Sequence, residues 1–366
     1  NNVKRSRGQT DFSHEVYDAM AGCLACKSCA GQCPIKVNVP EFRSRFLELY
    51  HGRYQRPLRD YLIGSLEFTI PYLTYAPGLY NAVMGSKWVS GLLERHVGML
   101  DSPLIHRYNL QSTLTRCNVA VASVPALREL SDEQRQRSVV LVQDAFTRYF
   151  ETPLLASLIQ LVHQLGYRVF LAPYSANGKP LHVQGFLGAF AKSAVRNASQ
   201  LKALADCGVP LVGLDPAMTL VYRQEYQKVP GLEGSPTVLL PQEWLIDALP
   251  ESIAQAPTQT FRLLAHCTEK TNVPASTSQW EKVFGRVGLK LVTEATGCCG
   301  MSGTYGHEAR NQGTSKTIFE QSWATKLDQP GEALATGYSC RSQVKRQADR
   351  ALRHPLEVVL ERLLAK

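Results

Sequence analysis

Four cysteines near the start of the sequence have a type and spacing that can do redox chemistry. They lie in GCLACKSCAGQCP, residues 22–34, spaced C-x2-C-x2-C-x3-C before a proline: Cys23, Cys26, Cys29 and Cys33. Bacterial ferredoxins bind 4Fe-4S clusters with this spacing. Two-residue gaps let three thiolates converge on one cube while the intervening backbone N–H groups point at the sulfurs. A zinc site uses well-separated C-x2-C pairs, so zinc is the weaker alternative here.

The fourth cysteine of the run raises the question of a second cluster. In two-cluster ferredoxins this cysteine ligates the other cluster, and the following proline turns the chain out of the site. The sequence has no second run of this kind. Either Cys33 folds back as the fourth ligand, or the partner run lies upstream of Asn1. We expect the second arrangement, because the chain begins without methionine and is interpreted as a piece of a longer or processed protein.

A second group of thiols lies in the last third of the chain: Cys267, Cys298, Cys299 and Cys340. The sequence predicts that each follows or ends one of three strands, and such positions meet at the carboxyl edge of an open α/β sheet. Glycines in CCGMSGTYG let backbone amides approach a cluster closely: Gly300, Gly303 and Gly306. Adjacent cysteines can bind two irons of one cluster. Iron–sulfur is therefore the main interpretation, with zinc or a structural thiol group as alternatives.

The remaining candidates receive supporting roles or none. His266 and His307 flank the second group, and we expect them to be hydrogen-bonding neighbours rather than ligands. Cys117 and Cys207 stand alone and are expected to be buried free thiols. No residue of this chain is assigned a catalytic role.

Strands and helices alternate from about residue 137. Buried strands are predicted at 138–146 and 167–173 around a helix at 152–166, and the same order returns at 261–269, 278–288 and 289–296. A shift of 122 residues superimposes the two copies without a gap and places Gly166 on Gly288 and Gly178 on Gly300.

The cysteines distinguish the two copies. At that shift each thiol of the second copy faces a residue that binds metal poorly: Ala145, Ala176, Asn177 and Met218 face Cys267, Cys298, Cys299 and Cys340. We infer that the first copy has lost a metal site and remains as scaffold.

The region before the repeats reads as helical. Residues 39–50 carry Phe42, Phe46 and Leu49 at helical spacing, and residues 57–100 read as short apolar helices broken at Pro71 and Pro77. The apolar stretch 61–80 is typical of a core, or of a surface that rests on a membrane or a partner subunit.

These patterns predict an α/β protein with an N-terminal all-helical ferredoxin-type cluster domain and two tandem α/β repeats, the first degenerate. The expected boundaries are 1–115 for the helical domain, 116–235 for the degenerate repeat, 236–257 for a Pro/Gly-rich linker and 258–366 for the intact repeat.

Composition narrows the setting. The chain has 366 residues, 44% of them hydrophobic, and a net charge of +9, but no dense Lys/Arg tract with interleaved aromatics, so nucleic-acid binding is not expected. No apolar run reaches membrane-spanning length and no signal peptide is visible. Clustered cysteines then favour metal binding in a reducing compartment. We expect a cytoplasmic protein, with peripheral contact at the inner face of the membrane as an open alternative.

The second cysteine group resembles the cysteine-rich CCG domain, through HC…GCCGMSGTYGHE…GYSC. That domain is shared by heterodisulfide reductase, lactate-utilisation proteins and the iron–sulfur subunits of glycolate oxidase and anaerobic glycerol-3-phosphate dehydrogenase. Its motif ends in Cys-x-x-Cys, whereas Gly337 here replaces the first of that pair. The resemblance therefore implies a simpler cluster than a five-cysteine noncubane one.

The order of a ferredoxin run, a degenerate copy and an intact CCG copy resembles the C-terminal part of the large bacterial FAD-linked D-2-hydroxyglutarate dehydrogenases. That resemblance implies an N-terminal FAD-binding region as partner, with FAD bound there, a D-2-hydroxyacid substrate, and clusters that pass electrons to an acceptor that the sequence does not name. The alternatives are a non-catalytic, metal-stabilised docking module and the iron–sulfur subunit of a glycolate, lactate or glycerol-3-phosphate oxidoreductase.

Overall fold

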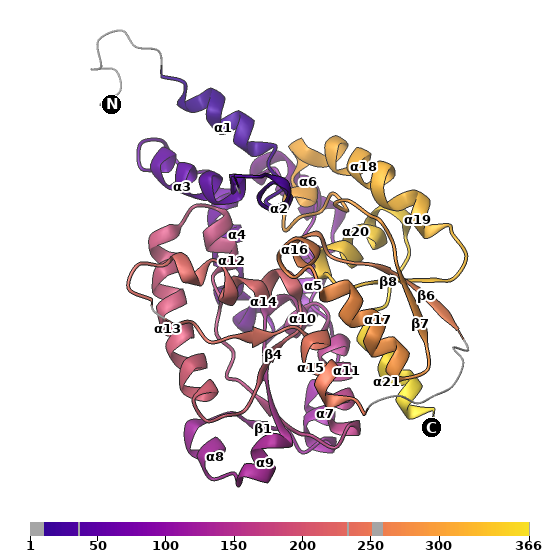
Figure 1. Ribbon diagram of the computed structural model, residues 1–366. Coiled ribbons are helices and arrows are strands. Elements are labelled where there is room, and N and C mark those ends of the chain that lie inside the picture. Colours follow the sequence, from indigo (N-terminus) through magenta and orange to yellow (C-terminus); the bar gives the residue numbers. More distant parts are fainter. Residues whose placement is uncertain (1–10, 36, 233, 251–258, 366) are drawn as a thin grey trace.

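The computed structural model describes residues 11–35, 37–232, 234–250 and 259–365. As predicted, the first region is helical: the named elements of its described part are α1(Ser13–Ala21), α2(Ser28–Gln32), α3(Val39–His51), α4(Leu58–Leu73), α5(Pro77–Met84), α6(Lys87–Val97) and α7(Leu110–Arg116). In Figure 1, α1 extends away from the body of the molecule, and α2 lies against the later part of the chain.

Helix α3 is confirmed, but it buries a different face from the one its aromatic residues suggest. Phe42 and Leu49 are 55% and 72% exposed, whereas Arg43 is buried. The Arg43 side chain donates from Nη1 to the carbonyl of Val183 at 2.7 Å and from Nε to the carbonyl of Met20 at 3.2 Å. Hydrogen bonds to main-chain carbonyls therefore orient this helix, which apolar spacing could not reveal.

The predicted break at Pro71 is wrong, because α4 runs through it to Leu73. A proline in a helix offers no N–H to the carbonyl four residues earlier, which here belongs to Glu67. The hydroxyl of Tyr174 donates to that carbonyl at 2.7 Å instead, so the carbonyl keeps a partner and the helix continues. Pro77 acts as predicted and starts α5.

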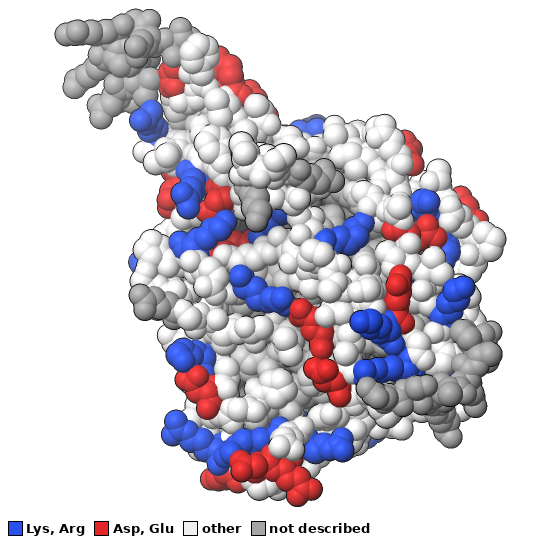
Figure 2. Space-filling model, in the orientation of Figure 1, with Lys and Arg blue, Asp and Glu red and all other residues white. Residues whose placement is uncertain are grey.

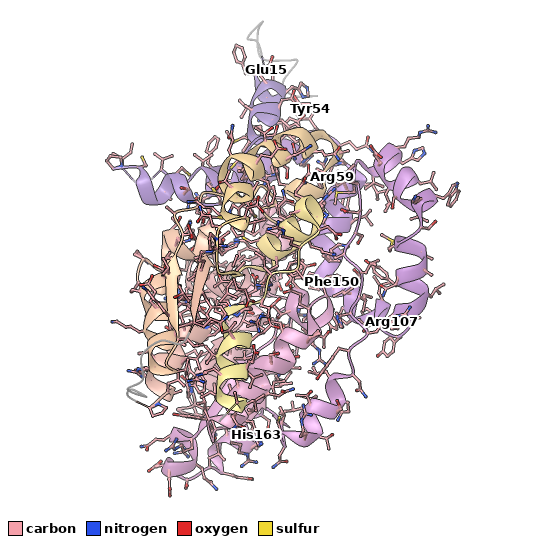
Figure 3. The ribbon with its side chains drawn as sticks, turned by 90° about the vertical axis from the view of Figure 1, so that its right-hand side faces the viewer. Glu15, Tyr54, Arg59, Arg107, Phe150 and His163 are labelled. Atoms are coloured by element: carbon pink, nitrogen blue, oxygen red, sulfur yellow. The ribbon has the colours of Figure 1, made fainter. Side chains whose placement is uncertain are left out.

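The apolar stretch 61–80 has two faces. Ile63 and Ile70 are buried, so one face is core, but Tyr72, Tyr75 and Leu79 are 73%, 88% and 68% exposed. Figure 3 shows these helices along one side of the molecule with side chains pointing away from the body. The stretch is therefore only partly a core element.

The first sheet has five parallel strands in the order β1-β3-β2-β4-β5. Its strands are β1(Ala120–Val121), β2(Ser138–Val142), β3(Arg168–Leu171), β4(Leu211–Gly213) and β5(Val238–Leu239). The accompanying helices are α8(Val124–Arg128), α9(Asp132–Gln136), α10(Ala145–Tyr149), α11(Thr152–Gln164), α12(Lys179–Val183), α13(Leu187–Ala205), α14(Pro216–Arg223), η2(Tyr226–Lys228) and α15(Pro241–Ala248).

The second sheet has three parallel strands in the order β7-β6-β8. Its strands are β6(Thr260–Leu264), β7(Lys290–Thr293) and β8(Glu332–Ala335). The accompanying helices are α16(Cys267–Asn272), α17(Ser276–Arg286), η3(Tyr305–His307), η4(Ala309–Asn311), α18(Gln312–Phe319), η5(Glu320–Ala324), α19(Thr325–Leu327), α20(Tyr338–Ala348) and α21(Pro355–Leu364). The chain is thus mixed α/β with two parallel sheets.

The two sheets correspond in register at the offset of 122 residues. Ser138 pairs with Arg168 in the first sheet, and Thr260 pairs with Lys290 in the second. The central strand has equivalent neighbours in both sheets, β3 and β4 in one and β7 and β8 in the other. The offset that the sequence indicates therefore holds for strand order and pairing.

Part of the predicted linker 236–257 is folded rather than open. Residues 238–239 form β5, which pairs with β4, and 241–248 form α15. Trp244 and Leu245 of this helix are buried in the hydrophobic core. Residues 251–258 of the predicted linker lie outside the described residues.

A continuous hydrophobic core joins the two sheets and their helices. α11 of the first unit packs on α21 of the second, which lie next to each other in Figure 1. Arg341 of α20 adds a two-pronged ion pair with Glu151, its Nε lying 2.9 Å from Oε1. The carboxyl ends of both sheets are thereby held in a fixed relation.

Candidate metal centres

The second cysteine group is assembled by two helix starts and one loop. Cys267 is the first residue of α16 and Cys340 lies in the first turn of α20, while the adjacent pair Cys298 and Cys299 follows β7. The expectation that Cys267 ends a strand is therefore corrected, since β6 stops at Leu264. The first turn of a helix carries a partial positive charge, which favours a thiolate there.

The four thiols of this group contact one another. Hydrogen bonds join Cys267 to Cys298, Cys298 to Cys299 and Cys299 to Cys340. The hydrogen bond from Cys267 lowers the pKa of Cys298, but the bond with Cys299 and burial outweigh it and raise that pKa to about 12. The structure thus brings together residues that are up to 73 positions apart, with Cys299 and Cys340 buried and Cys267 and Cys298 half-buried. Thiolates in such a setting need a cation.

The glycines of the CCG loop serve different purposes. Gly300 has φ +88°, and a Cβ there would lie 2.3 Å from the carbonyl oxygen of Ser315. Its N–H donates to the sulfur of Cys298 at 3.4 Å. Gly303 also has a left-handed φ, +61°, but open space around it. Gly300 therefore meets the predicted need for close approach to sulfur, whereas Gly303 is required by its backbone angle.

The N-terminal run forms a compact loop around α2. The N–H of Ala25 donates to the sulfur of Cys23 at 3.4 Å, and the N–H of Cys33 donates to the carbonyl of Cys29 at 2.9 Å. Burial raises the pKa of Cys23, and its charge also interacts with Cys26 and Cys29. The run thus has neighbouring thiols, and one backbone N–H, that of Ala25, points at a sulfur.

The two cysteine groups adjoin each other. Burial raises the pKa of Cys26, a backbone N–H lowers it, and the nearby thiol of Cys267 raises it again. Helix α2 packs on α16, where Gly31 comes so close to Thr271 that a Cβ would lie 2.7 Å from its methyl carbon. The hydroxyl of Ser302 donates to the carbonyl of Leu24. Sequence spacing gave no signal for this adjacency.

The first unit carries a carboxylate at the corresponding place. Asn177 and Gly178 stand where the second unit has Cys299 and Gly300, and their N–H groups donate to Glu67 at 3.3 and 2.8 Å. Glu67 is 1% exposed and comes from α4, far away in sequence. The Asn177 side chain donates to the carbonyl of Met218 at 3.0 Å. Glu67 was missed in the sequence because nothing in α4 marks it as a partner of this loop.

The two histidines differ in their surroundings. His266 is 4% exposed, its Nε2 lies 3.4 Å from the hydroxyl of Ser339, and burial lowers its pKa to about 4. His307 pairs through Nδ1 with Asp101 of the helical region. The isolated thiols of Cys117 and Cys207 are free and buried, as predicted.

The donor chemistry fits an iron–sulfur cluster. Cys23 and Cys298 each receive a backbone N–H on sulfur, and such bonds are part of a cluster's protein environment. Within residues 11–35, 37–232, 234–250 and 259–365, no three His, Cys, Asp or Glu side chains have the geometry of a single-ion site.

The surface shows no concentration of one charge on the face drawn in Figure 2, where Lys and Arg alternate with Asp and Glu. No helix in the described part of the chain is long and apolar enough to cross a membrane.

The chain, with its two α/β units and adjoining cysteine groups, has relatives among known proteins. No protein-family model matches the chain. The chain is 82% identical over 361 residues to the D-2-hydroxyglutarate dehydrogenase of Pseudomonas putida and 46% identical over 365 residues to that of Escherichia coli. Both alignments cover 99% of this chain but 36% of the relative, so the chain spans about a third of these relatives. The predicted resemblance to these dehydrogenases is confirmed.

A more distant relative aligns with most of this chain. The chain is 23% identical over 316 residues to one subunit of the anaerobic glycerol-3-phosphate dehydrogenase of Escherichia coli, an alignment that takes in 84% of this chain and 77% of that relative.

Proposed function

We propose that this chain is the iron–sulfur, electron-transferring part of an FAD-linked D-2-hydroxyacid dehydrogenase that oxidises D-2-hydroxyglutarate to 2-oxoglutarate. The observation that carries the proposal is the packing of α2, within the N-terminal cysteine run, on α16, which begins at Cys267 of the second cysteine group. The substrate is taken from the names of the relatives, which are D-2-hydroxyglutarate dehydrogenases.

The proposed ligands fall into two sets. The N-terminal set provides ligands for 4Fe-4S clusters: Cys23, Cys26, Cys29 and Cys33. The second set holds the second centre: Cys267, Cys298, Cys299 and Cys340. A bound iron–sulfur cluster supplies a one-electron carrier. The chain's own contribution is to shield the thiolates partly or fully from solvent, to donate N–H groups to sulfur through Ala25 and Gly300, and to hold the two sets close together by packing α2 on α16. Gly303 shapes the loop around the second set.

The proposed organisation is a helical cluster domain followed by a duplicated α/β unit. The common register at an offset of 122 residues supports the duplication. The first copy, which has no cysteine at the four equivalent positions, acts as scaffold, and β5 and α15 extend it beyond residue 235. The crossed arrangement, with Cys33 serving a cluster whose other thiolates precede Asn1, remains our proposal.

The partner in this proposal is the FAD-binding region of the full-length protein, which takes the hydride equivalent from the hydroxyacid. No residue of this chain is assigned to proton abstraction. The exposed apolar face of α4 and α5 offers a surface for that region or for peripheral contact at the inner face of a membrane. We place the protein in the cytoplasm.

One alternative function has support of its own. The similarity to a subunit of anaerobic glycerol-3-phosphate dehydrogenase also fits an iron–sulfur subunit of another hydroxy-substrate oxidoreductase. Full-length protein assayed with a dye acceptor should turn over D-2-hydroxyglutarate faster than glycolate, lactate or glycerol 3-phosphate. A preference for one of the other three would replace the proposed substrate.

The experiment that tests the metal chemistry is anaerobic purification with iron and acid-labile sulfide analysis. We expect iron and sulfide in equal amounts, and loss of part of both in Cys340→Ser. Cys117→Ser, at an isolated buried thiol, is the matched control and should retain the wild-type content. Zinc without sulfide, or a metal-free protein that leaves full-length turnover intact, would support a docking module instead.

A further inference from the structure

Lys27 lies in the middle of the N-terminal cysteine loop, yet its ammonium group is bound by the first α/β unit. Nζ is 2.7 Å from Oε1 of Glu225 and 2.5 Å from Oε1 of Gln224. Both partners lie between α14 and η2, almost 200 residues further along the chain. Lys27 is 7% exposed and Glu225 is 2% exposed, so solvent screens this ion pair very little.

Glu225 binds a second ammonium group with the same oxygen. Nζ of Lys179, at the start of α12, lies 2.5 Å from Oε1 of Glu225. Two ammonium groups share one carboxylate, so this triad leaves one positive charge uncompensated. The uncompensated charge is buried beside the loop, because Lys27 is covalently next to Cys26 and two residues before Cys29.

The loop backbone requires such an anchor. Lys27 has φ +61° and Ala25 has φ +52°, left-handed values that side-chain-bearing residues adopt at a cost in free energy. Residues keep these conformations when the surrounding structure holds them. The second unit holds the loop through Ser302, whose hydroxyl donates to the carbonyl of Leu24, and the first unit holds it through Lys27.

We propose that Lys27 and Glu225 are positioning residues of the N-terminal centre. Glu225 fixes the cysteine loop through the Lys27 side chain, and the positive charge of the triad raises the reduction potential of the cluster held by that loop. A cluster gains one negative charge when it is reduced, and a buried cation stabilises the reduced form. This inference rests on the proposed function, and it gives the first unit, which lacks the four clustered cysteines, a part in the redox site.

The test uses full-length protein, with iron and sulfide content and an EPR-monitored redox titration of the signal that Cys26→Ser removes. Lys27→Met is expected to shift the midpoint potential of that signal to a more negative value, and Lys27→Arg to restore most of the shift. Glu225→Gln is expected to move the potential the other way and to lower occupancy of this centre. The control is Asp206→Asn, which removes the partner of Lys202 in an exposed pair on the same unit.

The outcomes separate the two claims. If the wild type shows no signal that depends on Cys26, the proposed function fails. If the signal exists but Lys27→Met leaves its potential unchanged, the charge inference fails while the cluster stands. A loss of occupancy in both Lys27→Met and Lys27→Arg, at unchanged potential, would reduce the role to loop packing. Should Lys27→Met not fold, Lys179→Met tests the same charge, and a shift to more negative potential is again expected.

Discussion

The two α/β units use the same backbone device to hydrogen-bond two different acidic side chains. In the second unit the N–H of Gly300 donates to the sulfur of Cys298, and in the first the N–H of Gly178 donates to the carboxylate of Glu67. Both glycines have left-handed φ values, +88° and +82°. The loop therefore keeps an amide directed at an acidic side chain even where the clustered cysteines are absent.

The difference shows how a loop of this shape is satisfied without the cysteine cluster. A buried N–H without an acceptor costs about 1–3 kcal/mol, so a loop that faces no thiol needs another acceptor. Helix α4 supplies it with Glu67, and Asn177 replaces the thiol contact between Cys299 and Cys340 with a hydrogen bond to Met218. The helical region is thereby tied to the first unit, which lacks the cysteine cluster.

The largest expected effect comes from replacing a cysteine in each of the two units. Cys299→Ser should remove iron and sulfide from the second centre, because a fully buried thiolate ligand is replaced by a hydroxyl. Cys207→Ser, at a buried thiol of the first unit, should retain both and change stability by about 1 kcal/mol. Metal and sulfide analysis of the two variants side by side measures this. Equal losses would mean that the second unit holds no special site.

The next effect concerns the ion pair that joins the units. Glu151→Ala leaves the Arg341 guanidinium, 6% exposed, without its carboxylate. Removing one member of a buried pair costs about 3–5 kcal/mol, whereas exposed pairs contribute about 0–1 kcal/mol. Chemical unfolding of Glu151→Ala and of Asp206→Asn, which breaks the exposed pair with Lys202, should show that contrast. A small cost for Glu151→Ala would show that packing alone holds the units together.

Local patterns predicted the parts of the molecule that local chemistry determines. The ferredoxin spacing and the adjacent cysteines gave the candidate ligands, and the offset of 122 residues gave the correspondence between the two α/β units. Helix α3 followed from its apolar spacing. Each depends on residues close in sequence or on a pattern repeated along it.

The features that the sequence did not reveal are all long-range. The partners of Glu67 and Lys27 lie more than 100 residues away, and neither side chain belongs to a motif. The continuation of α4 through Pro71 depends on a hydroxyl from Tyr174. Burial of Trp244 in the hydrophobic core stabilises helix α15 in a segment whose Pro/Gly content predicts a linker. Tertiary partners decided these cases against local preference.

A smaller effect tests the carboxylate of the first unit by pH. Burial raises the pKa of Glu67 to about 8, although the N–H groups of Gly178 and Asn177 lower it. A carboxyl group whose pKa is raised on folding stabilises the protein when it is protonated. Its contribution is full at pH values below the pKa of the unfolded state, near 4.5, and is lost as the pH rises through the folded-state pKa of about 8. Glu67→Gln does not titrate, so its stability should fall less over this window.

The size of this effect follows from proton linkage. One proton corresponds to a slope of at most about 1.4 kcal/mol per pH unit, the difference expected between wild type and Glu67→Gln. Urea unfolding at pH 5, 6.5 and 8 measures the slope, and Glu320→Gln, at an exposed carboxylate beside α18, is the control. Parallel slopes for wild type and Glu67→Gln would mean that the two N–H bonds keep this carboxylate ionised throughout.

The smallest effect is expected at two turn glycines that occupy equivalent positions in the two units. Gly166 and Gly288 occupy equivalent turns with φ +78° and +74°, and neither has a neighbour closer than ordinary contact to the place of a Cβ. Substitution by alanine therefore costs only the left-handed backbone, about 1–2 kcal/mol at each site. Gly91→Ala in α6, a helical position with open space around it, should instead stabilise by about 0.5–1 kcal/mol. Unequal costs at Gly166 and Gly288 in chemical unfolding would show that the turns differ despite their common register.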